Sequence, residues 1–321
     1  MSEDAAVVVR RLTKTYGKTE AVKGIDFEVA PGEVFGFLGP NGAGKTTTIS
    51  MLCTLANPTG GTATVAGHDV VEERDEVRRN IGLVFQDPTL DGYLSAEQNL
   101  RFHAELYGVP RGAVDARIKR VMEMVALWDR KDAKVMTFSG GMKRRLEIAR
   151  GLLHSPRVLF LDEPTVGLDA QTRQQIWQYL DRLRREWSLT VLTTTHYIEE
   201  VEDADVVCII DHGKIIAQGS PERLKGEYGR RWLQVDTIDE ATRQEVQNRF
   251  PEAQVLGVKS VVVPAESADP ELFKTGVFEG KVMEVRHREP TLESVFLSLT
   301  GRELRDRADP GRVSNGRGER R

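Results

Sequence analysis

The segment GPNGAGKT, residues 39–46, restricts the possible folds of this chain more than any other feature. It fits the phosphate-loop pattern G-x-x-x-x-G-K-[ST] at every fixed position. The apolar run GEVFGFL before it is typical of a buried strand, and the spacing in KTTTISMLCTL after it predicts a helix. Pattern and context together favour a phosphate-binding loop in an α/β domain over a glycine-rich turn without a ligand.

The residue types of this loop suit a nucleotide bound with magnesium. Gly42 and Gly44 allow the backbone to turn so that its amide groups face a phosphate. Lys45 places a positive charge on the outer phosphates, and Thr46 offers a hydroxyl to the metal. The predicted loop contacts with nucleotide come from Gly39, Asn41, Gly42, Ala43, Gly44, Lys45, Thr46 and Thr47.

A second chemical element is RVLFLDEP, residues 157–164. Its apolar residues predict a buried strand, with Asp162 and Glu163 at the carboxyl end, where open α/β sheets bind ligands. Asp162 is suited to hold magnesium, directly or through water. Glu163 is suited to polarise an attacking water. An apolar strand that ends in Asp-Glu is a weak signal alone, and the phosphate loop makes it a strong one.

The order of predicted elements indicates two folded parts. Strands alternate with helices, the last of them YIEEVEDA at residues 197–204, as far as KIIAQG. This order predicts a mainly parallel sheet, with N-terminal strands before it and a helical insert over residues 96–137. We place an ATP-binding domain at 5–221 and a small α+β module at 222–301. For the Arg- and Gly-rich residues 302–321 we favour disorder, with a role at an anionic lipid surface as the alternative.

Bulk composition excludes several classes of protein. A net charge of −4 argues against a nucleic-acid-binding protein, although a local basic patch remains compatible with it. Cys53 and Cys208 are expected to be reduced, buried thiols. No apolar run approaches the roughly eighteen residues that span a bilayer, and no secretory segment is recognisable. We therefore expect a cytoplasmic chain that reaches a membrane only by docking on a partner.

A third motif, FSGGM at residues 138–142, opens a basic helix and offers a second anion site. With the motifs above, it makes the chain similar, over residues 5 to about 220, to the ATP-binding subunits of ABC transporters. The family's usual signature is LSGGQ, so Phe138 and Met142 depart from it, whereas Ser139, Gly140 and Gly141 are retained. The resemblance implies that these three residues face the γ-phosphate of the ATP held by the other protomer.

The resemblance assigns roles to four further residues. Tyr16 resembles the aromatic residue that stacks on adenine, although a tyrosine at a solvent edge is the plain alternative. Gln86 resembles the Q-loop glutamine, which contacts magnesium and links the site to the membrane partner. Asp169 resembles the D-loop aspartate, which contacts the opposite protomer, and His196 resembles the switch histidine, which contacts the γ-phosphate.

The resemblance therefore implies an ATPase that binds ATP and Mg²⁺, with Glu163, His196 and Gln86 as catalytic residues and Thr46, Gln86 and Asp162 at the metal. It implies a homodimer, or a pair with a similar ATPase, bound to separate transmembrane permease subunits on the inner face of the cell membrane. The ending EPTLESVFLSLTG, residues 289–301, resembles ABC-2 drug-exporter ATPases of the daunorubicin-resistance type, which associates the chain with antibiotic resistance.

Two alternatives remain at this stage. One is a soluble ABC ATPase that acts on ribosomes or DNA, although such proteins often have two cassettes or long coiled-coil inserts. The other is a P-loop kinase or GTPase, which would leave FSGGM and His196 unexplained. Lipids and polysaccharide precursors fit as cargo equally well as drugs, and the module after residue 221 could brace the dimer or regulate it.

Overall fold

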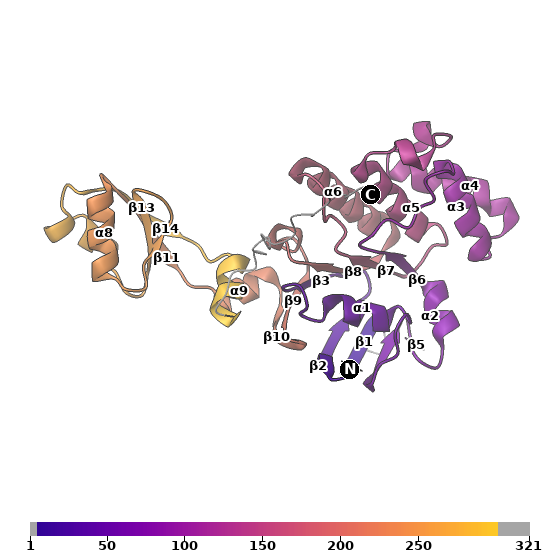
Figure 1. Ribbon diagram of the computed structural model, residues 1–321, viewed down its shortest axis with the longest axis horizontal. Coiled ribbons are helices and arrows are strands. Elements are labelled where there is room, and N and C mark those ends of the chain that lie inside the picture. Colours follow the sequence, from indigo (N-terminus) through magenta and orange to yellow (C-terminus); the bar gives the residue numbers. More distant parts are fainter. Residues whose placement is uncertain (1–4, 301–321) are drawn as a thin grey trace, which may run out of the picture. The chain divides into compact units, whose positions relative to one another are not determined.

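The computed structural model describes residues 5–300 of the chain. These residues form two compact units, one that runs as far as Gln218 and one that begins at Gly219 (Figure 1). The predicted tail at 302–321 lies outside the described residues. The boundary predicted between residues 221 and 222 falls within helix α7 (Pro221–Tyr228), whose first turn is capped by Ser220.

The first unit is built on a six-stranded sheet of order β10-β9-β3-β8-β7-β6. Strands β3, β6, β7, β8 and β9 pair in parallel, with Phe35 opposite Leu192 and Leu161 opposite Thr193. Their residues are almost all buried, as expected for a parallel sheet covered on both faces. The strands are β3 (Val34–Leu38), β6 (Ile81–Val84), β7 (Val158–Asp162), β8 (Thr190–Thr195), β9 (Val206–Asp211) and β10 (Lys214–Gly219).

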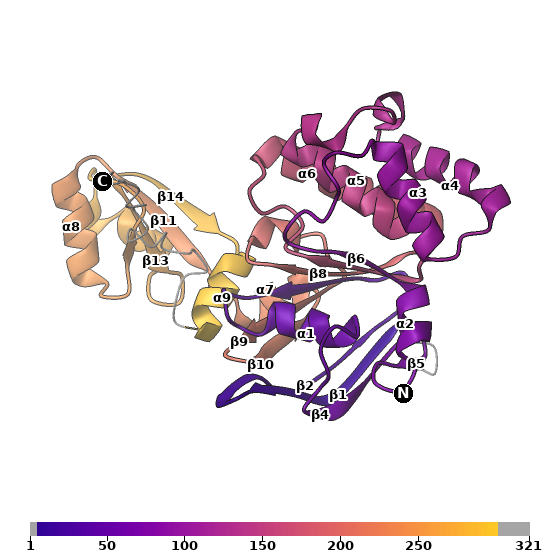
Figure 2. The same ribbon diagram turned by 45° about the vertical axis from the view of Figure 1, so that its right-hand side comes forward.

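A second, antiparallel sheet of order β2-β1-β4-β5 belongs to the same unit. Its strands are β1 (Val7–Tyr16), β2 (Thr19–Val29), β4 (Gly60–Val65) and β5 (His68–Asp69). Figure 2 shows helix α1 (Lys45–Leu52) between the two sheets. Phe27 from this sheet packs against Phe35 and Phe37 of β3, with ring centroids 5.1 Å apart in both pairs. This shared core fixes the start of α1, and therefore the phosphate loop, against β3.

The other helices of this unit lie at the edge of the sheets or on the opposite side of the parallel sheet from α1 (Figure 2). They are α2 (Arg74–Asn80), α3 (Ala96–Leu106), α4 (Arg111–Met124), α5 (Gly140–Leu152) and α6 (Ala170–Trp187). Three short 3₁₀ helices, η1 (Trp128–Arg130), η2 (Val135–Thr137) and η3 (Ile198–Glu200), complete the unit. The helical insert is therefore present where the sequence predicted it.

Two local expectations were wrong. YIEEVEDA was expected to form a helix, but only η3 forms, because Glu200 is drawn inward to a hydrogen bond with Thr165 and Val201 packs against Gly36. Tertiary contacts here override helix propensity. Helix α2 was not foreseen, although its acidic first turn and basic last turn complement the helix dipole.

The second unit contains a four-stranded antiparallel sheet of order β12-β13-β11-β14. Its elements are β11 (Trp232–Thr237), α8 (Glu240–Arg249), β12 (Gln254–Val255), β13 (Ser260–Pro264), η4 (Pro270–Phe273), η5 (Gly276–Phe278), β14 (Val282–Arg288) and α9 (Leu292–Thr300). Leu233, Val235, Val246 and Phe273 are among its buried core residues. The α+β character agrees with the pattern of the sequence.

Two expectations about the whole chain can be compared directly with the described residues. Cys53 and Cys208 are both free and buried, and burial raises the pKa of each thiol well above its usual value. Within residues 5–300, none of the helices combines the length and the apolar character needed to cross a membrane.

Candidate nucleotide-binding site

The phosphate loop connects β3 to α1 in a conformation that needs glycine. Gly42 and Gly44 have φ angles of 79° and 109°, in the region that other residues rarely adopt. A Cβ on Gly39 would lie 2.3 Å from Ile210 O, and a Cβ on Gly44 would lie 2.7 Å from Ala21 O. Helix α1 starts at Lys45 and is not capped by any side chain of the described residues. Its first amide groups therefore suit an anion.

Lys45 is folded back over this loop. Its Nζ donates to Gly39 O at 2.7 Å and to Pro40 O at 3.2 Å, and it lies 3.3 Å from Glu163 Oε1. The Lys45 and Glu163 side chains are only 4% and 7% exposed. The structure therefore brings together two residues that are 118 positions apart in the sequence, 163 minus 45, and that were predicted to act on the same phosphate.

Glu163 is held in a constrained position directly after β7. Its φ is 46°, which is uncommon for a residue other than glycine. Its amide group donates to Thr194 O and Thr194 Oγ1 at 3.2 and 3.1 Å. His196 Nδ1 lies 3.2 Å from Glu163 Oε2. Burial acts to raise the pKa of Glu163, but His196 and Lys45 outweigh it, so the pKa lies below its ordinary value. The carboxylate is therefore ionised and available as a base.

Asp162 lies beside the hydroxyl groups of two threonines. Its Oδ1 accepts from Thr46 Oγ1 at 3.1 Å and from Thr194 Oγ1 at 2.6 Å. One carboxylate beside one phosphate-loop hydroxyl fits Mg²⁺, which takes few protein ligands and keeps water and phosphate oxygens around it. Residues 5–300 contain no cluster of three or more His, Cys, Asp or Glu side chains that would form an all-protein metal site.

The signature residues lie at the start of α5. Ser139 Oγ accepts from Met142 N at 3.2 Å, and the Ser139 side chain is exposed. Gly141 is packed so closely that a Cβ there would lie 2.4 Å from Thr172 Cγ2. Thr172 in turn donates to Asp169, which caps α6. The signature and D-loop positions are thus joined to each other by packing, and both present exposed polar groups.

Comparison with known proteins decides the family. A family model described as ABC transporter matches residues 22–166. The chain is 37% identical to the daunorubicin/doxorubicin resistance ATP-binding protein DrrA of Streptomyces peucetius, over 94% of each chain. It is 39% identical to the linearmycin resistance ATP-binding protein LnrL of Bacillus subtilis, over 92% of this chain and 98% of the relative. The chain belongs to the ABC transporter family.

Solved structures of the ABC family agree in fold. CbiO1 of Clostridium perfringens, part of the ABC transporter complex cbiONQ, has a TM-score of 0.65 and 29% identity, and the match covers 77% of this chain and 96% of that chain. The dimeric ATP-binding cassette MJ0796 bound to ADP and Pi has a TM-score of 0.60 and 29% identity, over 67% and 98%. The predicted α/β ABC ATPase fold, and an ATPase activity coupled to transport, are confirmed. A P-loop kinase or GTPase is excluded, and the ribosome- or DNA-directed alternative gains no support.

Two other ABC-family positions are placed at the surface. Tyr16 ends β1 with half of its side chain exposed, and Lys14 Nζ lies 4.8 Å from the centre of its ring. Gln86 is exposed just after β6. The hydrogen bonds that hold the Gln86 segment run through its neighbours, from Arg144 to Phe85 O and from Thr89 N to Glu147. Within residues 5–300, no hydrogen bond joins the Gln86 side chain to Asp162 or Thr46, whose carboxylate and hydroxyl bond to each other.

Several functional candidates escaped the sequence analysis. Arg144 and Glu147 form a buried ion pair on α5, at 3.1 Å. Their spacing of three residues on a helix whose other face is apolar was the available signal. Thr194 in β8 and Thr165 in the turn after β7 were also missed, because single buried hydroxyl groups have no sequence pattern of their own.

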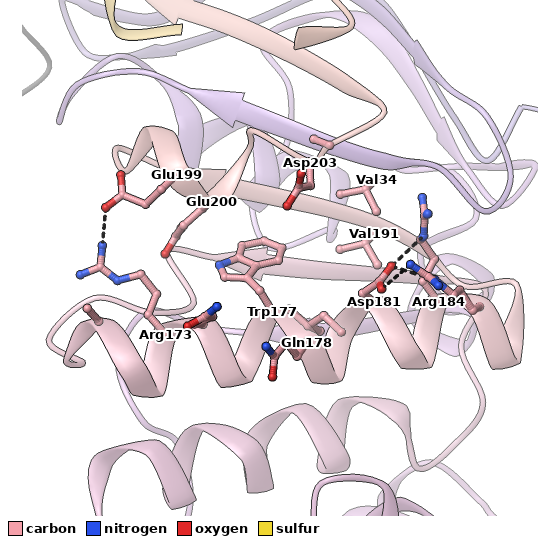
Figure 3. A pocket seen from close by; sticks show the side chains of 15 residues that line it. Val34, Arg173, Trp177, Gln178, Asp181, Arg184, Val191, Glu199, Glu200 and Asp203 are labelled. Carbon is pink, nitrogen blue, oxygen red and sulfur yellow. Dashed lines mark hydrogen bonds and ion pairs between the residues drawn. The ribbon is translucent and has the colours of Figure 1, made fainter. Parts of the chain in front are cut away.

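Glu200 was the last of these omissions. It lies in a groove of about 710 Å³ along α6, which Arg173 and Trp177 also line (Figure 3). Thr165, two residues after Glu163, donates to Glu200 Oε1. Desolvation raises the pKa of Glu200 to about 7. This contact joins the loop after Glu163 to the segment after His196.

Proposed function

We propose that this chain powers an exporter as one of a pair of ATPase subunits, with each of two ATP molecules held between the phosphate loop of one copy and the Ser139 helix of the other. One observation carries the proposal: Lys45, Asp162 and Glu163 gather beyond the carboxyl ends of β3 and β7, whereas within residues 5–300 the side chains of Ser139 and Asp169 bond only to the first turns of their own helices. The exposed signature groups are thus available to a second copy.

The roles of the residues in hydrolysis follow from their positions. Glu163, ionised and buried, orients the attacking water and accepts its proton. Lys45 draws negative charge from the γ-phosphate, and His196, next to Glu163, contacts the same phosphate. Mg²⁺ held by Thr46 and Asp162, with Gln86 nearby in the closed state, would neutralise charge on the phosphate oxygens. The reaction is ATP + H₂O → ADP + phosphate.

Two bound ATP molecules are needed to close the pair of subunits completely. If ATP binds only the closed pair, at about one hundred times its Kd, each site contributes about 2.7 kcal/mol to closure. Two sites give about 5.4 kcal/mol, close to the ~5.5 kcal/mol that moves an equilibrium from 1:99 to 99:1. Loss of the γ-phosphate from between Ser139 and His196 then lets the pair reopen.

We further propose that this motion passes to separate transmembrane permease subunits and that the pair docks on the inner face of the membrane. The relatives carry names such as resistance ATP-binding protein and Nod factor export ATP-binding protein, the latter 38% identical in Burkholderia lata over 94% of this chain and 99% of the relative. We infer that this chain also serves export. A homodimer is the simplest pair, and drug resistance is the nearest physiological role.

Mixing two inactive variants tests the shared site. Lys45→Ala disables the phosphate loop and Ser139→Arg disables the signature, so each protein alone should be inactive. In a mixed pair, one composite site keeps both Lys45 and Ser139, and ATPase activity should reappear. Because one intact site supplies only about half of the free energy of closure, activity should recover above that of either variant alone but below the binomial fraction of mixed pairs. If each site were formed by one chain alone, the mixture would stay inactive.

A matched control uses two variants in the same element. Lys45→Ala mixed with Thr46→Ala leaves no composite site with an intact phosphate loop, so this mixture should stay inactive.

Purification of the tagged chain from membranes tests the second part of the proposal, that the pair works with transmembrane permease subunits. It should recover a multi-span protein, whereas recovery of ribosomal RNA without such a protein would contradict the transport role.

A further inference from the structure

Arg144 donates hydrogen bonds to the main-chain carbonyl groups around Glu163, and none of the roles described above involves this arginine. It lies on α5, five residues after Ser139, and its side chain is only 6% exposed. Its Nη2 donates to Glu163 O at 3.0 Å and to Asp162 O at 3.4 Å, and its Nε donates to Pro164 O. One guanidinium therefore holds the carbonyl groups of three successive residues, with Glu163 in the middle.

The same guanidinium also reaches the segment that carries Gln86. Arg144 Nη1 donates to Phe85 O and pairs with Glu147 Oε2 at 3.1 Å. The other Glu147 oxygen accepts from Thr89 N at 2.8 Å. Arg150, one turn further along α5, donates to Thr89 O at 3.1 Å. Side chains of α5 are thus hydrogen-bonded to main-chain groups on both sides of Gln86, at Phe85 and at Thr89.

Through these contacts, α5 connects the Ser139 site with the Glu163 site, which act on different nucleotides in the proposed pair. Ser139 caps the first turn of α5 and faces the nucleotide of the partner copy in the proposed pair. The buried side of α5 holds Glu163, which acts on the nucleotide of its own copy. The φ of Glu163 is 46°, so its orientation depends on support from outside its own backbone preference. A helix moves as a rigid unit, so a shift at Ser139 is transmitted to the Arg144 contacts.

We propose that Arg144 is a positioning residue that couples the two ATP sites, so that γ-phosphate bound at Ser139 sets the orientation of Glu163 for the other ATP. The inference rests on the proposed shared site. Only arginine suits this position, because its planar fork of donors can serve several carbonyl groups and one carboxylate at once. Glu147 keeps that fork oriented and neutralises its charge.

The experiment compares the ATP dependence of hydrolysis in the full chain and in variants. Loss of one buried partner would leave the other uncompensated, so the first variant replaces both, Arg144→Met with Glu147→Met, which preserves volume and removes both charges together. In the unaltered chain, the Hill coefficient should be about 2, the number of sites. In the double variant it should fall below the unaltered value, because only the cooperativity of closure remains, with kcat lowered and the Kd for ATP, measured without hydrolysis, unchanged.

Arg144→Lys gives a second reading if the double variant does not fold. Lysine keeps the charge and the pairing with Glu147 but cannot serve the separate carbonyl groups, so the Hill coefficient should fall here as well. Arg145→Met is the matched control on the same helix. Arg145 Nη1 donates to Val125 O at 2.9 Å and its guanidinium lies over Tyr179, away from Glu163. Its Hill coefficient should stay at the unaltered value.

Each outcome has a fixed meaning. A Hill coefficient that stays at the unaltered value in both Arg144 variants overturns the inference and leaves the proposed function intact. Cooperativity lost equally in Arg145→Met also overturns it, because general loosening of α5 would then explain the effect. A Hill coefficient of about 1 in the unaltered chain contradicts the two-site model itself, and the coupling inference fails with it.

Discussion

Lys45 Nζ lies 3.3 Å from Glu163 Oε1, and both side chains are buried. This ion pair joins the phosphate loop to the end of β7 and keeps the Glu163 carboxylate ionised. In the proposed mechanism, the buried lysine charge would be shared between this carboxylate and a bound phosphate, and the pair would place the water-activating group next to the phosphorus that the water attacks. The two motifs are therefore one chemical unit rather than two neighbouring ones.

Glu163→Gln should bind ATP but hydrolyse it slower by roughly 10²–10⁴, the range of a general base. The amide keeps the shape of the side chain and cannot accept the proton, so ATP persists and the closed dimer accumulates. Steady-state kcat, and molecular mass in the presence of ATP by light scattering, measure the two effects. Glu105→Gln, an exposed site on α3, is the control and should leave both unchanged. Normal turnover in Glu163→Gln would remove that residue from catalysis.

Gly141→Ala should distort the start of α5, because the new Cβ would lie 2.4 Å from Thr172 Cγ2. Overpacking of this kind costs about 1–3 kcal/mol in the free energy of unfolding. It should also lower the ATPase rate, since Ser139 lies two residues before. Denaturant unfolding and kcat report the two losses separately.

A compensating change makes this prediction specific. Thr172→Ser removes Cγ2 but keeps the hydroxyl that donates to Asp169 at 2.7 Å. The double variant should therefore recover most of the stability that Gly141→Ala loses. Gly112→Ala on α4, where a Cβ meets nothing within 4 Å, is the control for a change from glycine to alanine in a helix. Additive losses in the double variant would show that the Thr172 contact is not the cause.

The sequence predicted those parts of the fold and site that depend on local pattern. The phosphate loop was recognisable because Gly39, Gly42 and Gly44 are required by main-chain geometry, which leaves a fixed spacing. The β7 strand was recognisable because burial on both faces demands an apolar run before Asp162. Each of these signals is contained within about ten residues, so no knowledge of the tertiary structure was needed.

The remaining features depend on contacts between distant segments. Arg144 is adjacent to Arg145 in a basic run, and only the packing of α5 under residues 162–164 distinguishes the buried arginine from the other. Similarly, η3 replaces a predicted helix because Glu200 bonds to Thr165, 35 positions earlier. Such pairings leave no local periodicity, so the sequence alone could not reveal them.

Tyr16→Ala should weaken ATP binding by about 1–3 kcal/mol, the usual contribution of stacking between a base and an aromatic side chain. This corresponds to a loss of affinity of about 5- to 150-fold. Tyr16→Trp should retain the affinity, because a larger ring offers the same face. Equilibrium titration with ATP measures the effect, and Tyr93→Ala, at a tyrosine that is 80% exposed, is the control. Equal affinity in Tyr16→Ala and the unaltered chain would favour the plain solvent-edge tyrosine.

Glu200 should make stability depend on pH. Its pKa is raised from 4.5 to about 7, chiefly by desolvation, so the folded state binds the proton more tightly than the unfolded state. The contribution of this group is therefore full below pH 4.5 and is lost as the pH rises through about 7. A shift of this size corresponds to at most about 3 kcal/mol in the free energy of unfolding.

Glu200→Gln should remove this dependence, because a neutral amide can still accept from Thr165 and has no proton to lose. The variant should match the unaltered chain just above pH 4.5 and be the more stable of the two above pH 7. Denaturant unfolding across this range measures the difference. Glu105→Gln is the control, since Glu105 is exposed on α3 and is not among the charges that shift the pKa of Glu200. The free energy of unfolding of Glu200→Gln and of the unaltered chain could instead run parallel over the whole pH range. In that case Glu200 is ionised in the folded state, and the hydrogen bond from Thr165 to Glu200 does not titrate near neutral pH.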